Sequence, residues 1–249
     1  MKLPSAFFIG VVAALALVAT LAAGPAFAQE ISIDLGEGPT STGRIVQLVI
    51  LVTVLALAPS ILVMVTSFTR IVVVLSFLRT AIGTQSAPPN TVIISLALFL
   101  TGFVMAPVLE QVYADGVRPL IDGEITEEEA FDAAIVPVQA FMLDHVREQD
   151  LRLFVDMAGS DAQTAEEAPL SALIPAFMIS ELRRAFEIGF LLFLPFLVID
   201  MVVASVLMSM GMMMLPPVMI SLPFKLIFFV LVDGWYLVAG SLVESFTPA

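Results

Sequence analysis

Long apolar stretches alternate with short polar ones along this chain, and four of them are long enough to cross a membrane. These four cover residues 45–68, 90–110, 186–207 and 218–241. A helix needs roughly 20 apolar residues to span a hydrocarbon core of about 30 Å. A fifth apolar run, 71–78, is too short to span and predicts a helix at the membrane interface or buried in protein. The pattern therefore predicts an all-α, polytopic membrane protein built of long helical hairpins.

Composition supports the membrane assignment. Hydrophobic residues make up 59% of the chain and charged residues 13%, and the mean hydropathy is +1.05. Soluble domains are about 45–50% apolar and about 25% charged. The sequence has no cysteine, which rules out disulfides, thiol nucleophiles and cysteine metal sites.

The first 28 residues have the order of a secretory signal peptide. Lys2 precedes an apolar run over 6–23, and Ala26-Phe27-Ala28 is a small-x-small cleavage site. We expect cleavage between Ala28 and Gln29, which places the mature N-terminus on the periplasmic side of a bacterial inner membrane. The alternative is an uncleaved first anchor helix. A polar lead, 29–43, follows.

The negative charge is concentrated in one segment. The net charge is −13, and 110–167 holds fifteen acidic residues and three arginines. Thr126 stands three residues before Glu129, which predicts a capping box at a helix start. We interpret 110–170 as an acidic, periplasmic helical insert between a first membrane hairpin, 44–109, and a second, 171–249. Such acidity argues against binding to nucleic acid or anionic lipid.

Catalytic chemistry is not indicated. His145 is the single histidine, and we interpret it as a solvated helix residue. The run 127–129 is a helix start rather than a carboxylate pair, and no phosphate loop, zinc spacing or nucleophile elbow is present. We expect no enzyme activity, no cofactor and no metal.

Charges inside apolar stretches are informative, because a charge that faces lipid is costly without a partner. Arg183 and Glu187 are four residues apart and can pair on one helix face. Asp200 and Lys225 lie about ten residues on either side of a turn, so they should meet at one depth as a structural ion pair or as part of an ion path. Asp233 interrupts the last span.

Arginines also report on topology. Arg70 and Arg79 flank the short apolar run and should mark the cytoplasmic side. Arg183 and Arg184 then fall on the opposite side, which is unusual for a simple bundle in lipid.

The turn between the last two spans is rich in methionine. "GMMML" covers 211–215 and is followed by Pro216 and Pro217. Thioether side chains are soft gap fillers, so the loop could plug into a neighbour. Several copies around an axis could instead form a deformable apolar ring that excludes water.

Two blocks resemble a known family. "SFTRIVVVLSFLRTAIGTQSAPPN" (67–90) and "ELRRAFEIGFLLFLPFLVIDMVVASVLMSMGMMMLPPVMISLPFKLIFFVLVDGW" (181–235) look like the signature blocks of the FliP family of flagellar proteins. The resemblance includes the spacing of the two blocks on either side of an acidic insert, and it extends to the signal peptide. The lead 29–43 and the loop 158–168 carry little of it.

The resemblance implies a function beyond what the residues themselves indicate. Proteins of this family form a ring of five copies with FliR and four copies of FliQ, with FlhB attached. This ring is the export gate of the flagellar type III secretion apparatus inside the membrane ring of the basal body, and it passes unfolded flagellar proteins. Its helices are raised out of the bilayer, which would remove the conflict at Arg183 and Arg184. The resemblance assigns a pore gasket to Met212, Met213 and Met214, with loop geometry set by Gly211, Pro216 and Pro217.

Two alternatives remain at this stage. The homologous subunits of virulence injectisomes generally lack a cleaved signal and have a shorter insert. A proton-coupled secondary transporter could use Asp200, Glu187 and Lys225 as a relay, although such transporters usually show internal repeats, which are absent from this sequence.

Overall fold

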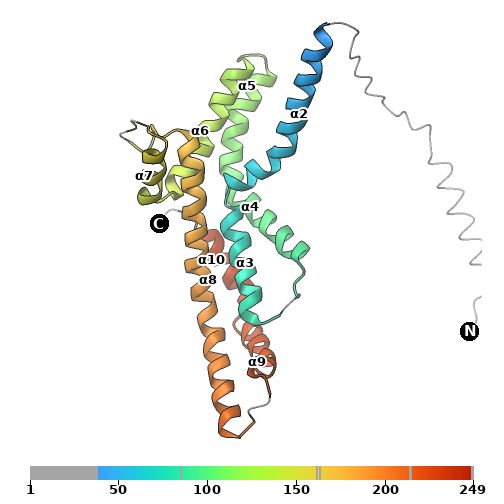
Figure 1. Ribbon diagram of the computed structural model, residues 1–249, viewed down its shortest axis with the longest axis vertical. Helices are drawn as coiled ribbons and strands as arrows, with labels where there is room; N and C mark the ends of the chain where they lie inside the picture. Colours follow the sequence, from blue (N-terminus) through green and yellow to red (C-terminus); the bar gives the residue numbers. More distant parts are fainter. Residues whose placement is uncertain (1–38, 85, 161, 163, 213–214, 248–249) are drawn as a thin grey trace, which may run out of the picture. The chain divides into compact units, whose positions relative to one another are not determined.

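The computed structural model describes residues 39–84, 86–160, 162, 164–212 and 215–247, which form helices joined by turns, with no strand among them (Figure 1). The all-α class is confirmed. In order, the elements are α2 (Pro39–Met64), α3 (Phe68–Ile82), α4 (Asn90–Val112), the π-helix η1 (Tyr113–Val117), α5 (Arg118–Ile121), α6 (Glu127–His145), α7 (Glu148–Met157), α8 (Leu170–Ser209), α9 (Pro217–Leu231) and α10 (Gly234–Glu244). The expected signal peptide, with its cleavage site at Ala28 and Gln29, lies outside the described residues.

The chain divides into two compact units within α2, at Val54 and Leu55. The described part of the first unit is the N-terminal portion of α2. All other helices belong to the second unit, which holds the buried core and every site discussed below.

The four expected spans fall on helices. Among the described residues, two continuous helical stretches are long and apolar enough to cross a membrane: Asn90–Ile121 and Leu170–Ser209. The α9–α10 pair would be a third if counted as one span, although it is bent by 64°. The apolar part of α2, Leu48–Ile61, is shorter. α8 has 40 residues, which at ~1.5 Å per residue makes it about 60 Å long, twice the thickness of a hydrocarbon core.

The short apolar run 71–78 forms α3, which is buried in protein rather than spread on an interface. α3 lies along α8 (Figure 1) and supplies fully buried side chains such as Ile71, Val74 and Leu78. These positions recur at three- and four-residue intervals, as one helix face requires. At Gly189 of α8 an added Cβ would lie 2.7 Å from the Phe77 ring, so the absence of a side chain there permits the close crossing.

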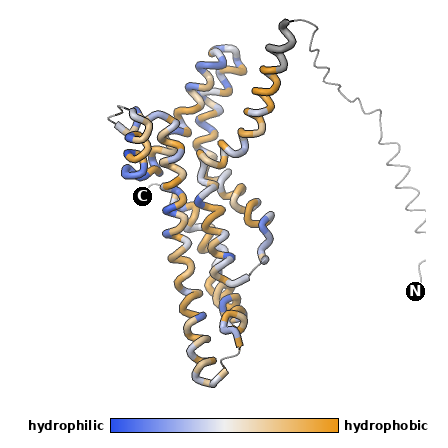
Figure 2. Tube along the Cα trace, viewed as in Figure 1, coloured by the Kyte–Doolittle hydropathy of each residue, from blue (hydrophilic) through white to orange (hydrophobic). Residues whose placement is uncertain are grey.

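The acidic insert is helical, as its sequence predicts. Thr126 and Glu129 form the capping box at the start of α6: the Thr126 N–H donates to Glu129 Oε2 at 2.8 Å, and the Glu129 N–H donates to Thr126 Oγ1. α6 continues through Pro137 without a break. Figure 2 shows polar residues concentrated along α5, α6 and α7, whereas α8 and α9 are largely apolar.

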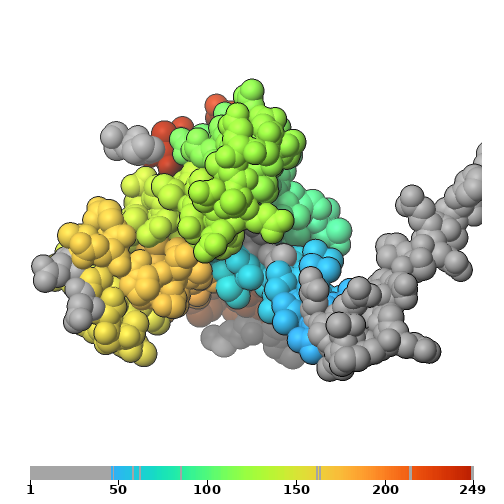
Figure 3. Space-filling view, turned by 90° about the horizontal axis from the view of Figure 1, so that it is seen from above, coloured from blue at the N-terminus to red at the C-terminus, as the bar shows by residue number. Residues whose placement is uncertain are grey.

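Ser180 fastens the insert to α8. Its Oγ, fully buried, accepts the Arg147 N–H at 3.0 Å and lies 2.7 Å from Asp150 Oδ2. In the view along the long helices, the insert helices gather beside the start of α8 at one end of the second unit (Figure 3). The polar end and the apolar hairpin α8–α9 are thus joined by one continuous helix.

Candidate functional site

α8 ends in a Schellman motif. Gly211 has φ +75°, a left-handed conformation that favours glycine. The Gly211 N–H donates to the Met208 carbonyl at 3.1 Å, and the Met212 N–H donates to the Leu207 carbonyl at 3.0 Å. This pair of bonds satisfies the last carbonyls of α8. The left-handed residue and its two hydrogen bonds thus end α8 at this point.

Prolines begin the next helix. Pro216 is the N-cap of α9 and Pro217 its first residue, where the missing N–H costs nothing and the fixed φ suits a helix. Gly211 thus ends α8, and Pro216 and Pro217 begin α9. That these three residues set the geometry of the loop between the helices stays a prediction. Of the three expected gasket residues, Met212 is exposed; Met213 and Met214 lie outside the described residues.

The end of this hairpin carries exposed thioethers. Met208, Met210 and Met212 are all exposed, and so is Leu215. In water an apolar turn of this kind would be unfavourable. The tip of the α8–α9 hairpin is thus an apolar surface that has no cover within the described part of the chain.

An ion pair holds the hairpin together below its tip. Lys225 Nζ on α9 lies 2.6 Å from Asp200 Oδ2 on α8, so the contact expected from the sequence is present. The Ser221 hydroxyl donates to the other carboxylate oxygen at 2.5 Å. Lys225 is 3% exposed, so its charge depends on these partners.

Lys225 also joins the hairpin to α3. Its Nζ donates to the Ala81 carbonyl at 3.2 Å, in the last turn of α3. The C-terminus of a helix carries partial negative charge and unpaired carbonyls, which a cation stabilises. One ammonium group therefore ties together three helices.

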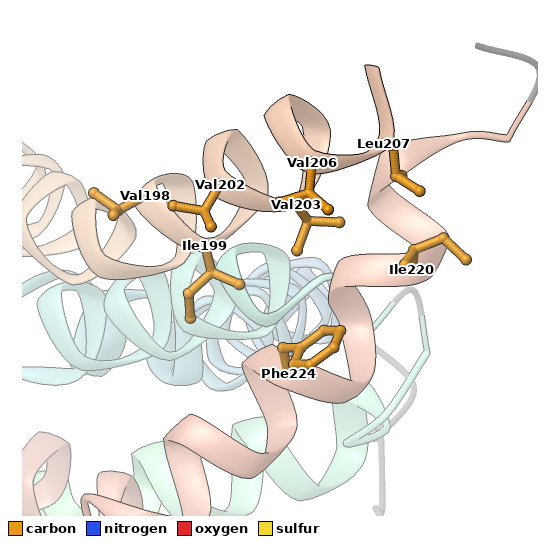
Figure 4. A pocket seen from close by; sticks show the side chains of 8 residues that line it. All are labelled: Val198, Ile199, Val202, Val203, Val206, Leu207, Ile220 and Phe224. Carbon is orange, nitrogen blue, oxygen red and sulfur yellow. The ribbon is translucent and has the colours of Figure 1, made fainter. Parts of the chain in front are cut away.

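An apolar hollow of about 410 Å³ lies between α8 and α9, from the level of Val198 to that of Leu207 (Figure 4). Branched aliphatic side chains of α8 and two residues of α9 line it: Val198, Ile199, Val202, Val203, Val206, Leu207, Ile220 and Phe224. The two helices are thus held at the polar cluster and are not fully packed against each other nearer to the turn.

A second ion pair, which the sequence did not predict, lies in the core. The Arg70 guanidinium on α3 donates to both carboxylate oxygens of Glu181 on α8, with Nε to Oε2 at 2.8 Å. Nη1 donates to the Ser245 carbonyl at 3.0 Å, and the guanidinium lies over the Phe246 ring, 3.7 Å from its centre. A bidentate pair of this kind has restricted geometry and is stronger than a single contact.

This burial corrects one interpretation of Arg70. Its side chain is 1% exposed, so it serves as an internal counter-charge and gives no information on the water-facing side. Arg79, at the other end of α3, is half-buried and bonds to Asn90 Oδ1 at 2.5 Å. The assignment of the cytoplasmic side now rests on Arg79 and stays a prediction.

The interpretation of His145 as a solvated residue is wrong. His145 is buried, with Nδ1 2.8 Å from the Phe141 carbonyl and its ring packed against Phe141 and Phe246. The covering ring of Phe246 comes from a segment about 100 residues further along the chain, so helical spacing could not reveal it. Phe141, one helical turn before His145, is the local sequence feature that could have indicated an apolar face and therefore a buried His145.

The remaining charges differ in their surroundings. Arg183 Nε donates to Glu187 Oε1 at 3.0 Å, and both side chains are exposed. Arg184 is half-buried beside Asp144 and His145. Asp233 lies between α9 and α10 with φ +51°. Within the described residues, no group of three or more His, Asp and Glu side chains could hold a metal ion.

Comparisons with known proteins identify the family of the chain. The FliP family matches residues 51–242. The chain is 64% identical to the flagellar biosynthetic protein FliP of Caulobacter vibrioides over 243 residues, which is 97% of this chain and 91% of the relative. Identity is 54% to the FliP of Bacillus subtilis over 87% of this chain and 98% of the relative. It is 50% to that of Aquifex aeolicus over 91% and 96%. Both signature blocks, the ion pair and the methionine turn fall within the matched residues, and the chain belongs to the FliP family of flagellar biosynthetic proteins.

Proposed function

We propose that this protein is a pore-forming subunit of the flagellar type III export gate, which passes unfolded flagellar proteins across the inner membrane. The observation that carries the proposal is the α8–α9 turn. α8 ends there in the Schellman motif at Gly211, and the side chains of Met208, Met210 and Met212 are exposed. Soft side chains carried at the end of a rigid helix can close around a passing chain and still deform.

The proposed gasket consists of Met212, Met213 and Met214 from several copies. An apolar constriction excludes water and ions by dewetting, even when its geometric opening is not fully closed. The pair between Asp200 and Lys225 supports the hairpin on which the loop is carried. The polar cluster would thus hold the two helices together, while the tip of the same hairpin deforms around the passing chain.

The proposal extends to partners and location. Five copies of this chain would assemble with FliQ and FliR, with FlhB attached, inside the membrane ring of the flagellar basal body. The acidic insert and the mature N-terminus would be periplasmic. The role is conduction and not catalysis. The apolar helices Asn90–Ile121 and Leu170–Ser209 support a location in the inner membrane.

The transporter alternative has less support. A relay from Glu187 to Asp200 would follow one helix over thirteen residues, a distance of about 20 Å. Glu187 is bonded to Arg183, and Asp200 to Lys225 and Ser221. These contacts make two separate ion pairs, which fits structural roles better than a proton path.

Replacement of all three loop methionines by alanine tests the gasket. We expect normal amounts of assembled complex and raised ion conductance, because small side chains leave an opening in a loop that supports little packing. Tryptophan at the same positions should slow export, because the rigid indole side chain adapts less to a passing chain than the flexible thioether of methionine does. Alanine at Met201 and Met219, which are also exposed but lie on α8 and α9, is the matched control and should not leak.

The opposite pattern would contradict the proposal. If the methionines are core filler, the triple alanine variant should assemble poorly, through cavities that cost about 2–5 kcal/mol per buried site. The complex that still assembles should then remain impermeable to ions. Complex amount and conductance must therefore be measured on the same preparation.

A further inference from the structure

A polar hollow of about 300 Å³ lies where the insert meets α8 and the end of α10. The last residues of α6, one residue of α8 and the residues that follow α10 line it: Asp144, His145, Arg184, Ser245, Phe246 and Thr247. None of them belongs to the α8–α9 turn, on which the proposed function depends. The polar hollow is therefore a separate candidate for a binding site.

The guanidinium in the polar hollow has no partner. Arg184 is half-buried, yet it donates no hydrogen bond and has no Asp or Glu oxygen within 4.0 Å among the described residues. The like charge of Arg70 is close enough to repel it, and Arg70 is itself paired with Glu181. A half-buried guanidinium whose five N–H donors lack acceptors is unfavourable. Arg184 is therefore suited to an anionic group of a ligand.

Two other residues of the polar hollow offer acceptors. The Asp144 carboxylate is exposed and forms no ion pair within the part of the chain that the structure describes. Nδ1 of His145 lies 2.8 Å from the Phe141 carbonyl. A carbonyl only accepts, so Nδ1 carries the proton and Nε2 of the neutral ring is an acceptor. The polar hollow thus holds both an unpaired cation and unpaired acceptors.

The two hydroxyl residues of the polar hollow differ. The Ser245 hydroxyl donates to the Leu242 carbonyl at 2.7 Å and accepts a bond from Arg70 at 3.0 Å, so it is already satisfied. The Thr247 side chain is exposed and makes no hydrogen bond to any described residue. Thr247 therefore adds a free donor beside Arg184.

The polar hollow lies at the ends of two expected membrane spans. Arg184 is two residues before the third expected span, and Ser245 is four residues after the fourth. Arg70 bonds both to Glu181, three residues before Arg184 on α8, and to Ser245. These bonds place the start of one span and the end of the other at the same level.

The surface of the protein changes character at this level. Before Arg184, α8 is covered by α6 and α7 of the insert, along which polar residues are concentrated (Figure 2). Beyond it, Phe190 and Leu191 of α8 are 65% and 64% exposed. The hydrocarbon core of a bilayer is flanked by polar headgroup regions, so a phospholipid headgroup belongs at such a boundary.

We propose that the polar hollow binds the headgroup of a zwitterionic phospholipid in which a phosphate is joined to a primary ammonium. The Arg184 guanidinium and the Thr247 hydroxyl bind the phosphate, since guanidinium–phosphate contacts are charge-assisted and can be bidentate. Asp144 and Nε2 of His145 accept hydrogen bonds from the ammonium. A headgroup without net charge suits a hollow that holds one free cation and one carboxylate beside an acidic insert.

The acyl chains of the same lipid have a path along α8. Leu191 lies seven residues after Arg184 and therefore on the same face of the helix. It is exposed, as is the neighbouring Phe190. The inference goes beyond the proposed function: it requires that the protein lies in a membrane, and it does not require a pore.

Native mass spectrometry of the full chain, purified in detergent, tests the headgroup chemistry. Phosphatidylethanolamine, phosphatidylcholine and phosphatidylglycerol with identical acyl chains are added in turn, and inorganic phosphate is the fourth probe. We expect one phosphatidylethanolamine per copy, bound about tenfold more tightly than phosphatidylcholine, whose trimethylammonium has no N–H to donate. Equal binding of the three lipids, tighter binding of phosphatidylglycerol, or phosphate bound as tightly as phosphatidylethanolamine would each overturn the proposal.

Two neighbouring arginines provide a matched pair of variants. Arg184→Gln should lower the affinity for phosphatidylethanolamine by about tenfold, because a charge-assisted bond to phosphate is lost. Arg183→Gln is the control and should bind as the unaltered chain does, because Arg183 is exposed, pairs with Glu187 and does not line the polar hollow. An equal loss in both variants would show that general surface charge, and not the polar hollow, attracts the lipid.

A third variant tests the ammonium contact. Asp144→Ala should abolish the preference for phosphatidylethanolamine over phosphatidylcholine, because both lipids keep their phosphate contacts. An unchanged preference would overturn the role of Asp144. The selectivity of the unaltered chain decides the proposal even if the variants fold poorly. A chain that retains no lipid would overturn this inference and leave the proposed function standing, since the gasket does not use the polar hollow.

Discussion

Lys225 is the residue on which most of the hairpin's polar contacts converge. Its ammonium lies against an acid of α8 and a terminal carbonyl of α3, and Ser221 completes the coordination of the acid. Compared with apolar residues of the same shape, a buried ion pair adds little to the free energy of unfolding or even lowers it. Its consequence lies in specificity: a single arrangement of three helices satisfies all these groups.

Removal of one charge of this pair should be damaging. Asp200→Ala leaves a buried ammonium without its acid, at a cost of about 3–5 kcal/mol, so we expect a large loss of assembled protein in membranes. Replacement of Lys225 by methionine in the same chain should recover part of it. Glu187→Gln is the control, because the exposed pair with Arg183 contributes at most about 1 kcal/mol. No recovery in the double variant would show that the two charges act separately.

Spacing predicted one of the buried pairs and not the other. The pair between Asp200 and Lys225 could be predicted from the sequence because a turn lies midway between them. Residues at equal distances from a hairpin turn lie at the same level of the two helices. Arg70 and Glu181 are separated by 111 residues and several helices. No local rule of sequence spacing connects two residues so far apart.

At the level of helices, close approach depends on a few positions without side chains. A Cβ at Gly116 of η1 would lie 2.8 Å from both the Ala130 carbonyl oxygen and the Ala134 Cβ on α6. The π-helical turn widens the helix at this point, and π-bulges often mark such adjustments. The insert packs as it does because η1 presents its glycine to α6.

Gly116→Ala should therefore destabilise the insert. Backbone atoms of α6 must move to admit the methyl group, and overpacking of this kind costs about 1–3 kcal/mol. Gly102→Ala is the control: a Cβ there meets nothing within 4 Å, so it should be neutral within a single copy. Thermal unfolding of the detergent-solubilised chain measures both, and equal midpoints would contradict the packing argument.

The capping box makes the start of α6 sensitive to acid. The hydrogen bond from the Thr126 backbone N–H, followed by that from its hydroxyl, lowers the pKa of Glu129 below its ordinary value of 4.5. The contribution to stability is complete above pH 4.5 and disappears as the pH falls through the lowered pKa. Hydrogen exchange at the first turn of α6 should increase in that range. In Glu129→Gln this step should be absent, and an unchanged step would assign it to another group.

At the scale of the whole molecule, hydropathy identified the helices but not their arrangement. The expected spans coincide largely with helices, yet 45–68 runs past the end of α2 at Met64, 186–207 is the second half of a 40-residue helix, and 218–241 is divided by the bend at Asp233. Hydropathy gives the length of an apolar run. It does not show whether an apolar run is surrounded by lipid or by protein. The run that forms α3 is therefore compatible with both an interfacial and a buried helix.

Cleavage of the leader remains a prediction about the whole chain. The order of charge, apolar run and Ala-x-Ala predicts that Gln29 is the mature N-terminus. Intact mass of protein purified from membranes should equal that of residues 29–249. Ala26→Leu should block cleavage and leave the longer form, since the site requires small residues. A full-length mass in the unaltered protein would favour the anchor-helix alternative.

The contacts of Arg70 also bear on the order in which the protein is made. Its two partners follow 111 and 175 residues later in the chain. The acidic partner, Glu181, is the nearer of the two: at about 5–20 residues per second, the ribosome needs roughly 6–22 s to synthesise 111 residues. During that interval α3 carries a cation with no counter-charge from its own chain, and the apolar face that later packs on α8 is uncovered. The nascent protein therefore passes through a long stage at which an insertase or chaperone must shield α3.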